Sequence, residues 1–328
     1  MTTLRKAWAT GKKPMPGKPS EIGTRKNVLK HLKEDRHLLI MCLPAIIKIF
    51  IFSYLPMIGI IIAFKNYIPA KGIIGSPWNG LKNFEFFFKS IDAWRILRNT
   101  MGLNVILIVV ELAASVFFAL LLYEILNRKA LKLYQSVMFF PYFFSWVLVG
   151  LMLTTLLNPA TGMLTTMIKA LTGKEIAFYS EPGYWLFILP IMGVWKSAGF
   201  SSLIYYSALM SISKELFEAA EIDGASKIQC IRHISIPFLS PMMVMLTILS
   251  VGKILRADFG LFYFVPRNIS MLYPVTDVLD TYVFRALTVN GDFAMSSAVG
   301  VFQSVVGFIL ILVTNKLSKM YNSEFGLF

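Results

Sequence analysis

Cysteine and histidine are scarce in this sequence, which holds two cysteines and three histidines among its 328 residues. Cys42 lies in a long apolar run and Cys230 in a polar stretch between two such runs, so we expect no disulfide between them. His31, His37 and His233 are interpreted as isolated histidines, two beside the first apolar run and one in the polar stretch, and a lone histidine is more often a solvated or interfacial residue than a ligand. The sequence therefore predicts neither a disulfide framework nor a metal site.

The chain also lacks the short motifs of nucleotide hydrolysis and of common hydrolases. Gly173-Lys174 is followed by Glu175 and has no glycine at the upstream position of a phosphate-binding loop. No GxSxG turn and no HExxH helix occurs. We therefore expect a protein that is not an enzyme and that binds no cofactor of its own.

Acidic residues are few, 18 against 32 Lys and Arg, and the net charge is +14. A nucleic-acid-binding surface needs a continuous basic patch. Here long apolar segments divide the basic residues, so we expect no nucleic-acid partner.

The sequence is rich in hydrophobic residues, which make up 56% of it, and its mean hydropathy is +0.65. A helix needs about 20 apolar residues to cross roughly 30 Å of hydrocarbon. Six segments meet this length, at 38–64, 99–123, 134–157, 184–209, 236–258 and 294–317. The sequence therefore predicts an all-α integral membrane protein with six transmembrane helices.

Lys and Arg favour the cytoplasmic side of a membrane protein. They are dense in residues 1–37 and in the short loops 124–133 and 210–235, and sparser in the longer loops between. We therefore expect a multi-pass protein of the cell membrane with both termini cytoplasmic, its basic tail contacting anionic lipid or acting as a cytoplasmic lid. The predicted organisation is a tail at 1–37, a membrane domain at 38–317 and a tail at 318–328.

The loop at 210–236 carries the most specific pattern in the chain. Glu218-Ala219-Ala220 is followed after three residues by Gly224, and nine residues later by Ile234-Ser235-Ile236-Pro237. A glycine bend between two short helices, and a proline that opens the next apolar helix, suit a rigid knob outside the bilayer. This spacing resembles the signature loop in the membrane subunits of binding-protein-dependent, type I ABC importers.

The resemblance implies one permease subunit that forms half of a transmembrane pathway. Its expected partners are a second, similar permease, two ATPase subunits that bind ATP and Mg²⁺, and an extracellular or periplasmic solute-binding protein. In such importers the signature loop is a coupling helix that sits in a cleft of the ATPase. The residues that match it are Glu218, Ala219, Ala220, Asp223, Gly224, Ala225, Ile234 and Pro237.

The outer segments resemble those of sugar importers. Gly80-Leu81-Lys82-Asn83-Phe84 and Leu97-Arg98-Asn99-Thr100 resemble the start of the core permease fold, and residues 259–293 resemble the corresponding region in permeases for polysaccharide fragments such as alginate oligosaccharides. After Pro274, apolar residues at helical spacing predict a surface helix at 275–283. This helix is either a cap over the bundle or a docking surface for the solute-binding protein.

We single out five ionisable residues within the predicted spans, where a charge costs about 2.5–3.5 kcal/mol at the centre of a helix. They are Lys48, Glu111, Lys196, Lys253 and Arg256. Lys48 and Glu111 are suited to pairing between the first two spans, and Arg256 to reaching the membrane surface.

Lys196 and Lys253 lie on the two predicted helices that flank the coupling loop. In the maltose importer, which the fold resembles, sugar is held between those helices at comparable distances from the loop. The matching positions here are Ser197, Phe200 and Ser201 before the loop, and Ser250, Ile254 and Ala257 after it, the last three expected on one helical face. The two lysines beside them indicate a pathway for an anionic, uronate-type oligosaccharide; packing or snorkelling is their alternative role.

Other classes of function stay open. A self-contained secondary transporter or channel would place ion-coupling carboxylates in broken mid-membrane helices, and Glu111 alone lies deep in a span. A membrane scaffold without transport would tolerate leucine at every polar position in the spans. Within the importer family, a permease for another small solute shares the same loop.

Overall fold

The computed structural model describes residues 36–321, and in that part of the chain it forms helices and no strand. This confirms the all-helical prediction. The chain divides into two units, Met1–Ile58 and Gly59–Phe328. The tail 1–37 lies almost wholly outside the described residues, as do residues 322–328 of the C-terminal tail.

The first unit contains α3 (Arg36–Ile49), which includes Pro44, then a π-helical turn, η1 (Phe50–Tyr54), and the start of a 3₁₀-helix, η2 (Leu55–Phe64). Ile40–Phe64 is long and apolar enough to cross a membrane. These helical residues therefore coincide with the first predicted span, 38–64. Lys48 lies in α3, and its pairing with Glu111 of the second unit stays a prediction.

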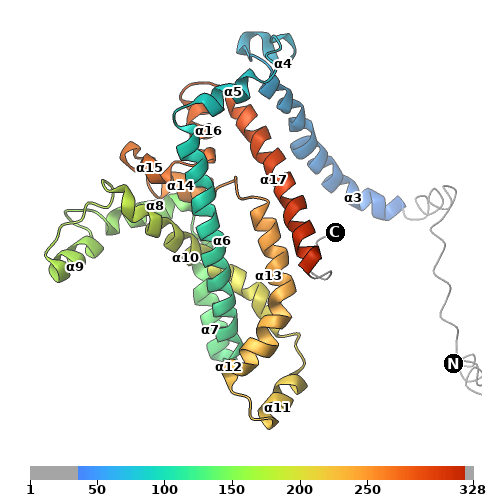
Figure 1. The fold of residues 1–328 in the computed structure, drawn as a ribbon, viewed down its shortest axis with the longest axis vertical. Coiled ribbons are helices and arrows are strands. Elements are labelled where there is room, and N and C mark those ends of the chain that lie inside the picture. The colour runs from blue at the N-terminus through green and yellow to red at the C-terminus, as the bar shows by residue number, and fades with distance from the viewer. Residues whose placement is uncertain (1–35, 322–328) are drawn as a thin grey trace, which may run out of the picture. The chain divides into compact units, whose positions relative to one another are not determined.

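Long helices run side by side in the second unit (Figure 1). They are α6 (Ala93–Tyr123), α10 (Trp185–Leu209), α13 (Ile236–Val251) and α17 (Phe293–Tyr321). Helix α10 packs along α6, and α13 packs against α17. Gly199 permits a close approach in α10, because a Cβ there would overlap the carbonyl oxygen of Met138.

The third predicted span is bent rather than straight. Residues 134–157 fall in α7 (Arg128–Phe139), η4 (Phe140–Phe143) and α8 (Trp146–Leu156), and the chain turns by 95° before α8. Pro141 limits the first helix, and the Ser145 hydroxyl caps the second by accepting a hydrogen bond from the Leu148 N–H. The described residues therefore hold five helices suited to spanning a membrane, or six if this bent pair counts as one.

The fifth predicted span ends earlier than expected. Helical structure begins at α12 (Lys227–Cys230), continues through a π-helical turn, η6 (Ile231–Ser235), and stops with α13 at Val251 instead of at 258. Residues 252–258 form turns and extended chain. The prediction that Ser250, Ile254 and Ala257 share one helical face is therefore wrong, because only Ser250 lies in the helix.

Shorter helices lie in the segments that connect the long ones. They are η3 (Pro69–Lys71), α4 (Gly72–Gly75), α5 (Lys82–Lys89), α9 (Met163–Thr172), η5 (Pro182–Tyr184), α11 (Lys214–Ile222), α14 (Phe259–Phe264), η7 (Ser270–Leu272), α15 (Tyr273–Thr276) and α16 (Leu279–Thr288). The surface helix predicted at 275–283 is therefore divided into α15 and α16, with a break at Asp277 and Val278.

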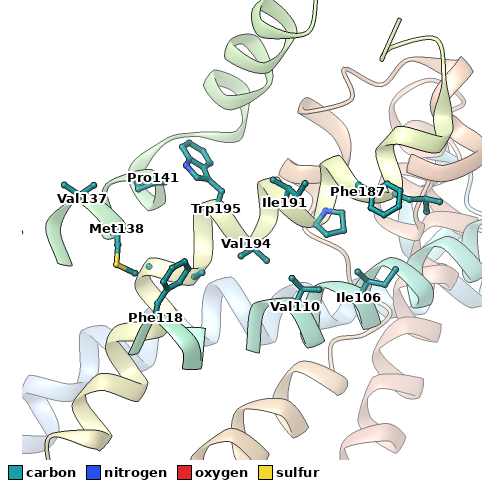
Figure 2. A pocket seen from close by; sticks show the side chains of 14 residues that line it. Ile106, Val110, Phe118, Val137, Met138, Pro141, Phe187, Ile191, Val194 and Trp195 are labelled. Atoms are coloured by element: carbon teal, nitrogen blue, oxygen red, sulfur yellow. The ribbon is translucent and has the colours of Figure 1, made fainter. Parts of the chain in front are cut away.

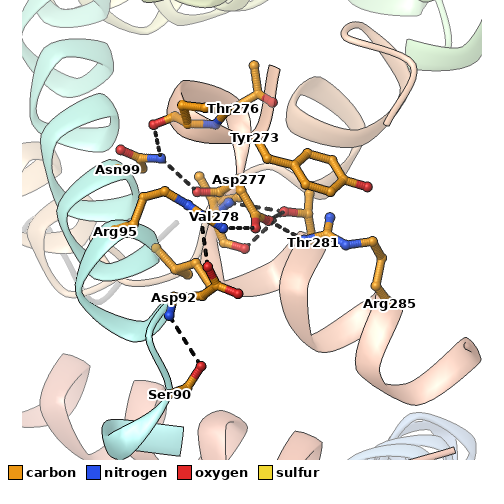
Figure 3. Close-up of polar contacts among 12 residues, drawn as sticks. Ser90, Asp92, Arg95, Asn99, Tyr273, Thr276, Asp277, Val278, Thr281 and Arg285 are labelled. Atoms are coloured by element: carbon orange, nitrogen blue, oxygen red, sulfur yellow. Dashed lines mark hydrogen bonds and ion pairs between the residues drawn. The ribbon is translucent and has the colours of Figure 1, made fainter. Parts of the chain in front are cut away.

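A buried ion-pair network explains this break (Figure 3). The Asp277 side chain is 2% exposed, and its Oδ1 accepts hydrogen bonds from Arg285 Nη2 at 2.5 Å and Thr281 Oγ1 at 2.9 Å. Its Oδ2 lies 3.4 Å from Arg95 Nη2 of α6. A buried carboxylate needs such partners, and the chain bends at Asp277 to reach them.

The side chains at the start of α6 complete the attachment of this outer segment. Asn99 Nδ2 donates to the carbonyl oxygens of Pro274, at 3.0 Å, and Asp277, at 3.2 Å. Thr100 Oγ1 accepts from the Leu279 N–H at 2.9 Å. The Asn-Thr pair singled out in the sequence therefore fixes α15 and α16 on α6, which favours the role of a structural cap for this part of the outer loop.

Candidate functional site

The coupling-loop residues form a helix-turn-helix whose turn depends on Gly224. Helix α11 begins after Ser213, whose hydroxyl accepts from the Glu215 N–H, and ends at Ile222. The Gly224 N–H donates to the Glu221 carbonyl at 3.0 Å and the Ala225 N–H to the Ala220 carbonyl at 2.9 Å. These two bonds make a Schellman motif, which needs a left-handed residue, and Gly224 has a φ of 79°.

The predicted coupling residues lie together on this loop. Glu218, Ala219, Asp223 and Gly224 are exposed, and Ala220 and Ala225 are partly covered. Ile234 is half-buried in η6, and Pro237 is exposed in the first turn of α13. Ile234 and Pro237 therefore belong to the continuous helical stretch of η6 and α13 that leads away from the loop.

The loop is attached to the end of α6 at two points. The ring of Phe217 packs against that of Tyr123, with 5.7 Å between ring centroids. Lys227 Nζ lies 2.7 Å from Glu124 Oε2 in an exposed ion pair. Leu216, Ile222 and Ile228 stay exposed, so the loop presents apolar side chains beside its carboxylates. From the sequence we stressed the charges of this loop and missed these apolar residues. Leu216, next to Glu215, was visible in the sequence as an apolar residue among acidic ones.

Two cavities of about 300 and 290 Å³ adjoin one another between α6, α10 and α13, and we name them by distance from the coupling loop. The farther, distal cavity and the nearer, proximal cavity share Ile108, Glu111, Ser250 and Lys253 in their linings. Polar side chains in the distal cavity come from five helices, α6, η4, α8, α10 and α13, and from the unwound segment 252–258. The linings of the two cavities are more polar than those of the other cavities described in the second unit.

Most of the predicted pathway residues line these cavities. The distal cavity includes Lys196, Ser197, Ser250, Lys253 and Ile254, and the proximal cavity includes Ser201, Ser250 and Lys253. Two predicted residues line neither of them. Phe200 stacks on Tyr142 at 4.7 Å, and the Ala257 N–H donates to Asp280 Oδ2 at 2.7 Å.

The cations of the distal cavity differ in how they are held. Lys196 Nζ donates to the Tyr142 carbonyl at 2.8 Å and lies over the rings of Tyr142 and Trp146. Arg256 Nη2 donates to Ser304 Oγ at 2.9 Å. Within residues 36–321, the Lys253 ammonium has no hydrogen-bond or ion-pair partner, and its side chain is exposed. Lys253 is therefore the cation available to a ligand.

The two carboxylates of the distal cavity are already engaged. Glu111 Oε1 accepts from Ser201 Oγ at 3.0 Å. Asp258 accepts from Trp146 Nε1 at 2.8 Å and from the N–H groups at the start of α14. Sequence reasoning missed Trp146, Tyr142 and Asp258 because the bend before α8 and the break after α13, which bring them to the cavity, were not predicted.

Three side chains from other helices hold the unwound segment 252–258. Asn104 Nδ2 donates to the Ile254 carbonyl at 2.7 Å, and Gln303 Nε2 donates to the Leu255 carbonyl at 2.6 Å. Asp280 Oδ2 accepts from the Ala257 N–H. Burial raises the pKa of Asp280, whereas its hydrogen bonds from Ala257 and Gln303 oppose the rise. Polar amides at Asn104 and Gln303 inside apolar runs were the sequence signal for this contact.

A larger cavity, about 840 Å³, lies elsewhere, along α6, the end of α7 and α10 (Figure 2). Its lining is apolar, with Phe118, Phe187, Val194 and Trp195 among its side chains and no charged residue. Sugar hydroxyls need hydrogen-bonding partners when they leave water. This groove therefore does not suit an oligosaccharide.

Residues 112–321 match the family described as binding-protein-dependent transport system inner membrane component. Protein LplB of Bacillus subtilis is 34% identical over 297 residues, which cover 90% of this chain and 92% of that protein. The polygalacturonan/rhamnogalacturonan transport system permease protein YteP of the same organism is 34% identical over 302 residues, covering 92% and 93%.

A similar fold occurs in the crystal structure of a bacterial ABC transporter involved in the import of the acidic polysaccharide alginate. The TM-score is 0.82 at 30% sequence identity, and the match covers 90% of this chain and 99% of that one. A second structure shows a bacterial alginate ABC transporter in complex with an alginate pentasaccharide-bound periplasmic protein. It matches with a TM-score of 0.81 over 89% of this chain.

Proposed function

The chain belongs to the family of binding-protein-dependent transport system inner membrane components and is a permease of the sugar-importing ABC type, and we propose that it carries an acidic oligosaccharide. It contributes half of the transmembrane pathway. A uronate chain, with one carboxylate on each sugar, is the substrate class that its polar cavities suit.

The cations of the distal cavity are the observation that carries this proposal. Three cations, Lys196, Lys253 and Arg256, face two carboxylates whose oxygens already accept hydrogen bonds. Tyr142 and Trp146 also line this cavity, and their rings lie beneath the Lys196 ammonium. A carboxylate that enters gains a charge-assisted hydrogen bond with Lys253, worth about 1.5–3 kcal/mol.

The relatives support the same substrate class. One curated relative is named for transport of polygalacturonan and rhamnogalacturonan, and a similar structure is of an importer of the acidic polysaccharide alginate. Both names describe acidic polysaccharides. The role of the partners follows the same pattern: a second permease completes the pathway, two ATPases bind ATP and Mg²⁺, and a solute-binding protein delivers the sugar.

Coupling to ATP hydrolysis is assigned to α11 and the turn at Gly224. Its carboxylates, including Glu218, and its apolar tips at Leu216 and Ile222 suit a cleft that combines basic and apolar side chains. The contacts of this loop with the end of α6 link movement of the loop to a helix that lines both cavities.

The whole proposal is tested with the complex of this chain and its co-encoded partners in proteoliposomes. We expect ATP hydrolysis to rise when a binding protein loaded with an oligogalacturonate or an oligo-alginate is added, and labelled sugar to accumulate only with ATP. Uptake that proceeds without ATP, driven by an ion gradient, would instead support the self-contained transporter.

Replacing Lys253 by methionine is expected to discriminate between charged and neutral sugars. Loss of the free ammonium should raise the KM for an oligogalacturonate about tenfold, since 1.4 kcal/mol corresponds to one factor of ten. The KM for the same oligosaccharide with its carboxyl groups reduced to alcohols should change less than about twofold. Uptake of labelled sugar at a series of concentrations measures both values.

Lys253→Arg is the matched control, since it retains the positive charge, and it should keep most of the preference for the charged sugar. Equal effects of Lys253→Met on both sugars would contradict a carboxylate-binding role and favour the alternative in which the lysine only reaches toward polar surroundings.

A further inference from the structure

The unwound segment 252–258 connects α13 to α14 and supplies four residues of the distal cavity: Lys253, Ile254, Arg256 and Asp258. Outside a helix, its carbonyl and N–H groups need partners, because unpaired backbone groups in a buried segment are costly. Local turn bonds satisfy some of them, such as the bond from the Arg256 N–H to the Lys253 carbonyl at 2.7 Å, and side chains of distant parts of the chain satisfy three others. The position of the cavity-lining residues therefore depends in part on those side chains.

The contacts come from three directions. Asn104 of α6 and Gln303 of α17 are both 8% exposed, and they bind the successive carbonyl groups of Ile254 and Leu255. Asp280 of α16 accepts the Ala257 N–H, and its carboxylate also lies 3.5 Å from Gln303 Nε2. Three residues within four positions, Ile254, Leu255 and Ala257, are thus held by α6, α17 and α16.

We propose that these three side chains are positioning residues that hold the segment so that its cations face the substrate. They are Asn104, Gln303 and Asp280. We name the set the segment clamp. The proposal rests on the transport function proposed above and adds a specificity-determining role for residues that do not themselves line the cavity, Gln303 and Asp280.

The segment clamp also connects the cavity-lining segment 252–258 to α16 in the outer loop. Asp280 follows the break at Asp277 and Val278, where α15 and α16 are fixed to α6. A force that shifts α16 therefore acts through the Asp280 carboxylate on Ala257, next to Arg256 and Asp258 of the cavity lining. The outer loop, where a solute-binding protein would dock, is in this way connected to the residues that contact sugar.

The first test follows the position of the segment without any substrate. In the full complex, with Cys42 and Cys230 replaced by serine, Lys253→Cys is labelled with a charged maleimide. Adding Asp280→Ala or Gln303→Leu should raise the labelling rate about tenfold, the change expected when a hydrogen bond worth about 1.4 kcal/mol no longer holds the segment. Adding Ser296→Ala, which removes a hydrogen bond to the Val283 carbonyl elsewhere on α16, should change the rate less than twofold.

The second test measures transport in the natural-cysteine protein. Asp280→Ala should raise the KM for an oligogalacturonate about tenfold while changing the maximal rate less than twofold, because the coupling loop is untouched. Asp280→Asn retains an acceptor oxygen for the Ala257 N–H and should restore the KM to within twofold of the unsubstituted protein. A general loss of folding would lower the maximal rate in both variants instead.

The outcomes separate the two proposals. Unchanged labelling and unchanged KM in both Asp280→Ala and Gln303→Leu would overturn the segment clamp while leaving the importer intact. Absence of oligogalacturonate and oligo-alginate uptake by the unsubstituted complex would overturn the proposed substrate, and the labelling experiment would still decide whether the clamp positions the segment.

Discussion

Replacement of Asp277 by alanine is expected to release α15 and α16 from α6 and to speed amide hydrogen exchange in both helices at least about hundredfold. The carboxylate is 2% exposed and joins Arg285 and Arg95. Removal of one member of a buried ion pair costs about 3–5 kcal/mol, because the remaining charges are left without a partner. Exchange measured by mass spectrometry on the peptides that cover 273–288 tests this directly.

Asp92→Ala is the matched control for this variant. Asp92 Oδ1 lies 2.8 Å from Arg95 Nη1, but its side chain is 45% exposed, so solvent screens the pair. Exposed ion pairs contribute about 0–1 kcal/mol, and we expect exchange in the same peptides to change less than about fivefold. Equal exchange in Asp277→Ala and Asp92→Ala would show that the buried network does not hold the outer segment.

Replacement of Gly224 by proline is expected to reduce uptake about hundredfold. Proline fixes φ near −65°, whereas Gly224 has a φ of 79°, and it removes the N–H that donates to Glu221. If proline destabilises the turn by about 3 kcal/mol, the population of the correctly folded loop falls about hundredfold. ATP hydrolysis and sugar uptake by the reconstituted complex are measured together.

Gly224→Asn provides the comparison, since asparagine adopts the left-handed conformation more readily than other side chains, and there is open space around Gly224. This variant should retain at least about a third of the uptake, a loss of less than 0.7 kcal/mol on the same scale. Uptake by Gly224→Pro within tenfold of the unsubstituted protein would contradict the role of the turn in coupling.

The coupling loop could be predicted closely because its structure is local. The Schellman turn joins residues that are three to five positions apart, so Gly224 and its distance from Ala220 sufficed to indicate it. The long apolar runs likewise indicated most of the long helices. Local hydrogen bonds and helix-length apolar segments are the features that a sequence displays without reference to the rest of the chain.

The break after α13 depends on residues far away and was not predictable in the same manner. The prediction extended the fifth span through residues 252–258, and Asn104, which holds this segment in place, lies 150 residues from its partner Ile254. Asp277 interrupts the expected helix at 275–283 to reach Arg95, 182 residues away. Six of the eight predicted pathway residues still line the cavities, four because the helices that carry them were predicted correctly and two, Lys253 and Ile254, because the unwound segment directly follows α13.

Helix α6 extends over 31 residues, with the outer-loop contacts of Asn99 near one end and the contact of Tyr123 with the coupling loop at the other. At 1.5 Å per residue it is about 46 Å long. A tilt of about 10° around one end would displace the other by about 8 Å, more than the rise of one helical turn. Tilting α6 about its Tyr123 end would therefore move its other end by several ångströms, and Asn104, which lies between the two ends, would move by a smaller amount and shift Ile254 through their hydrogen bond.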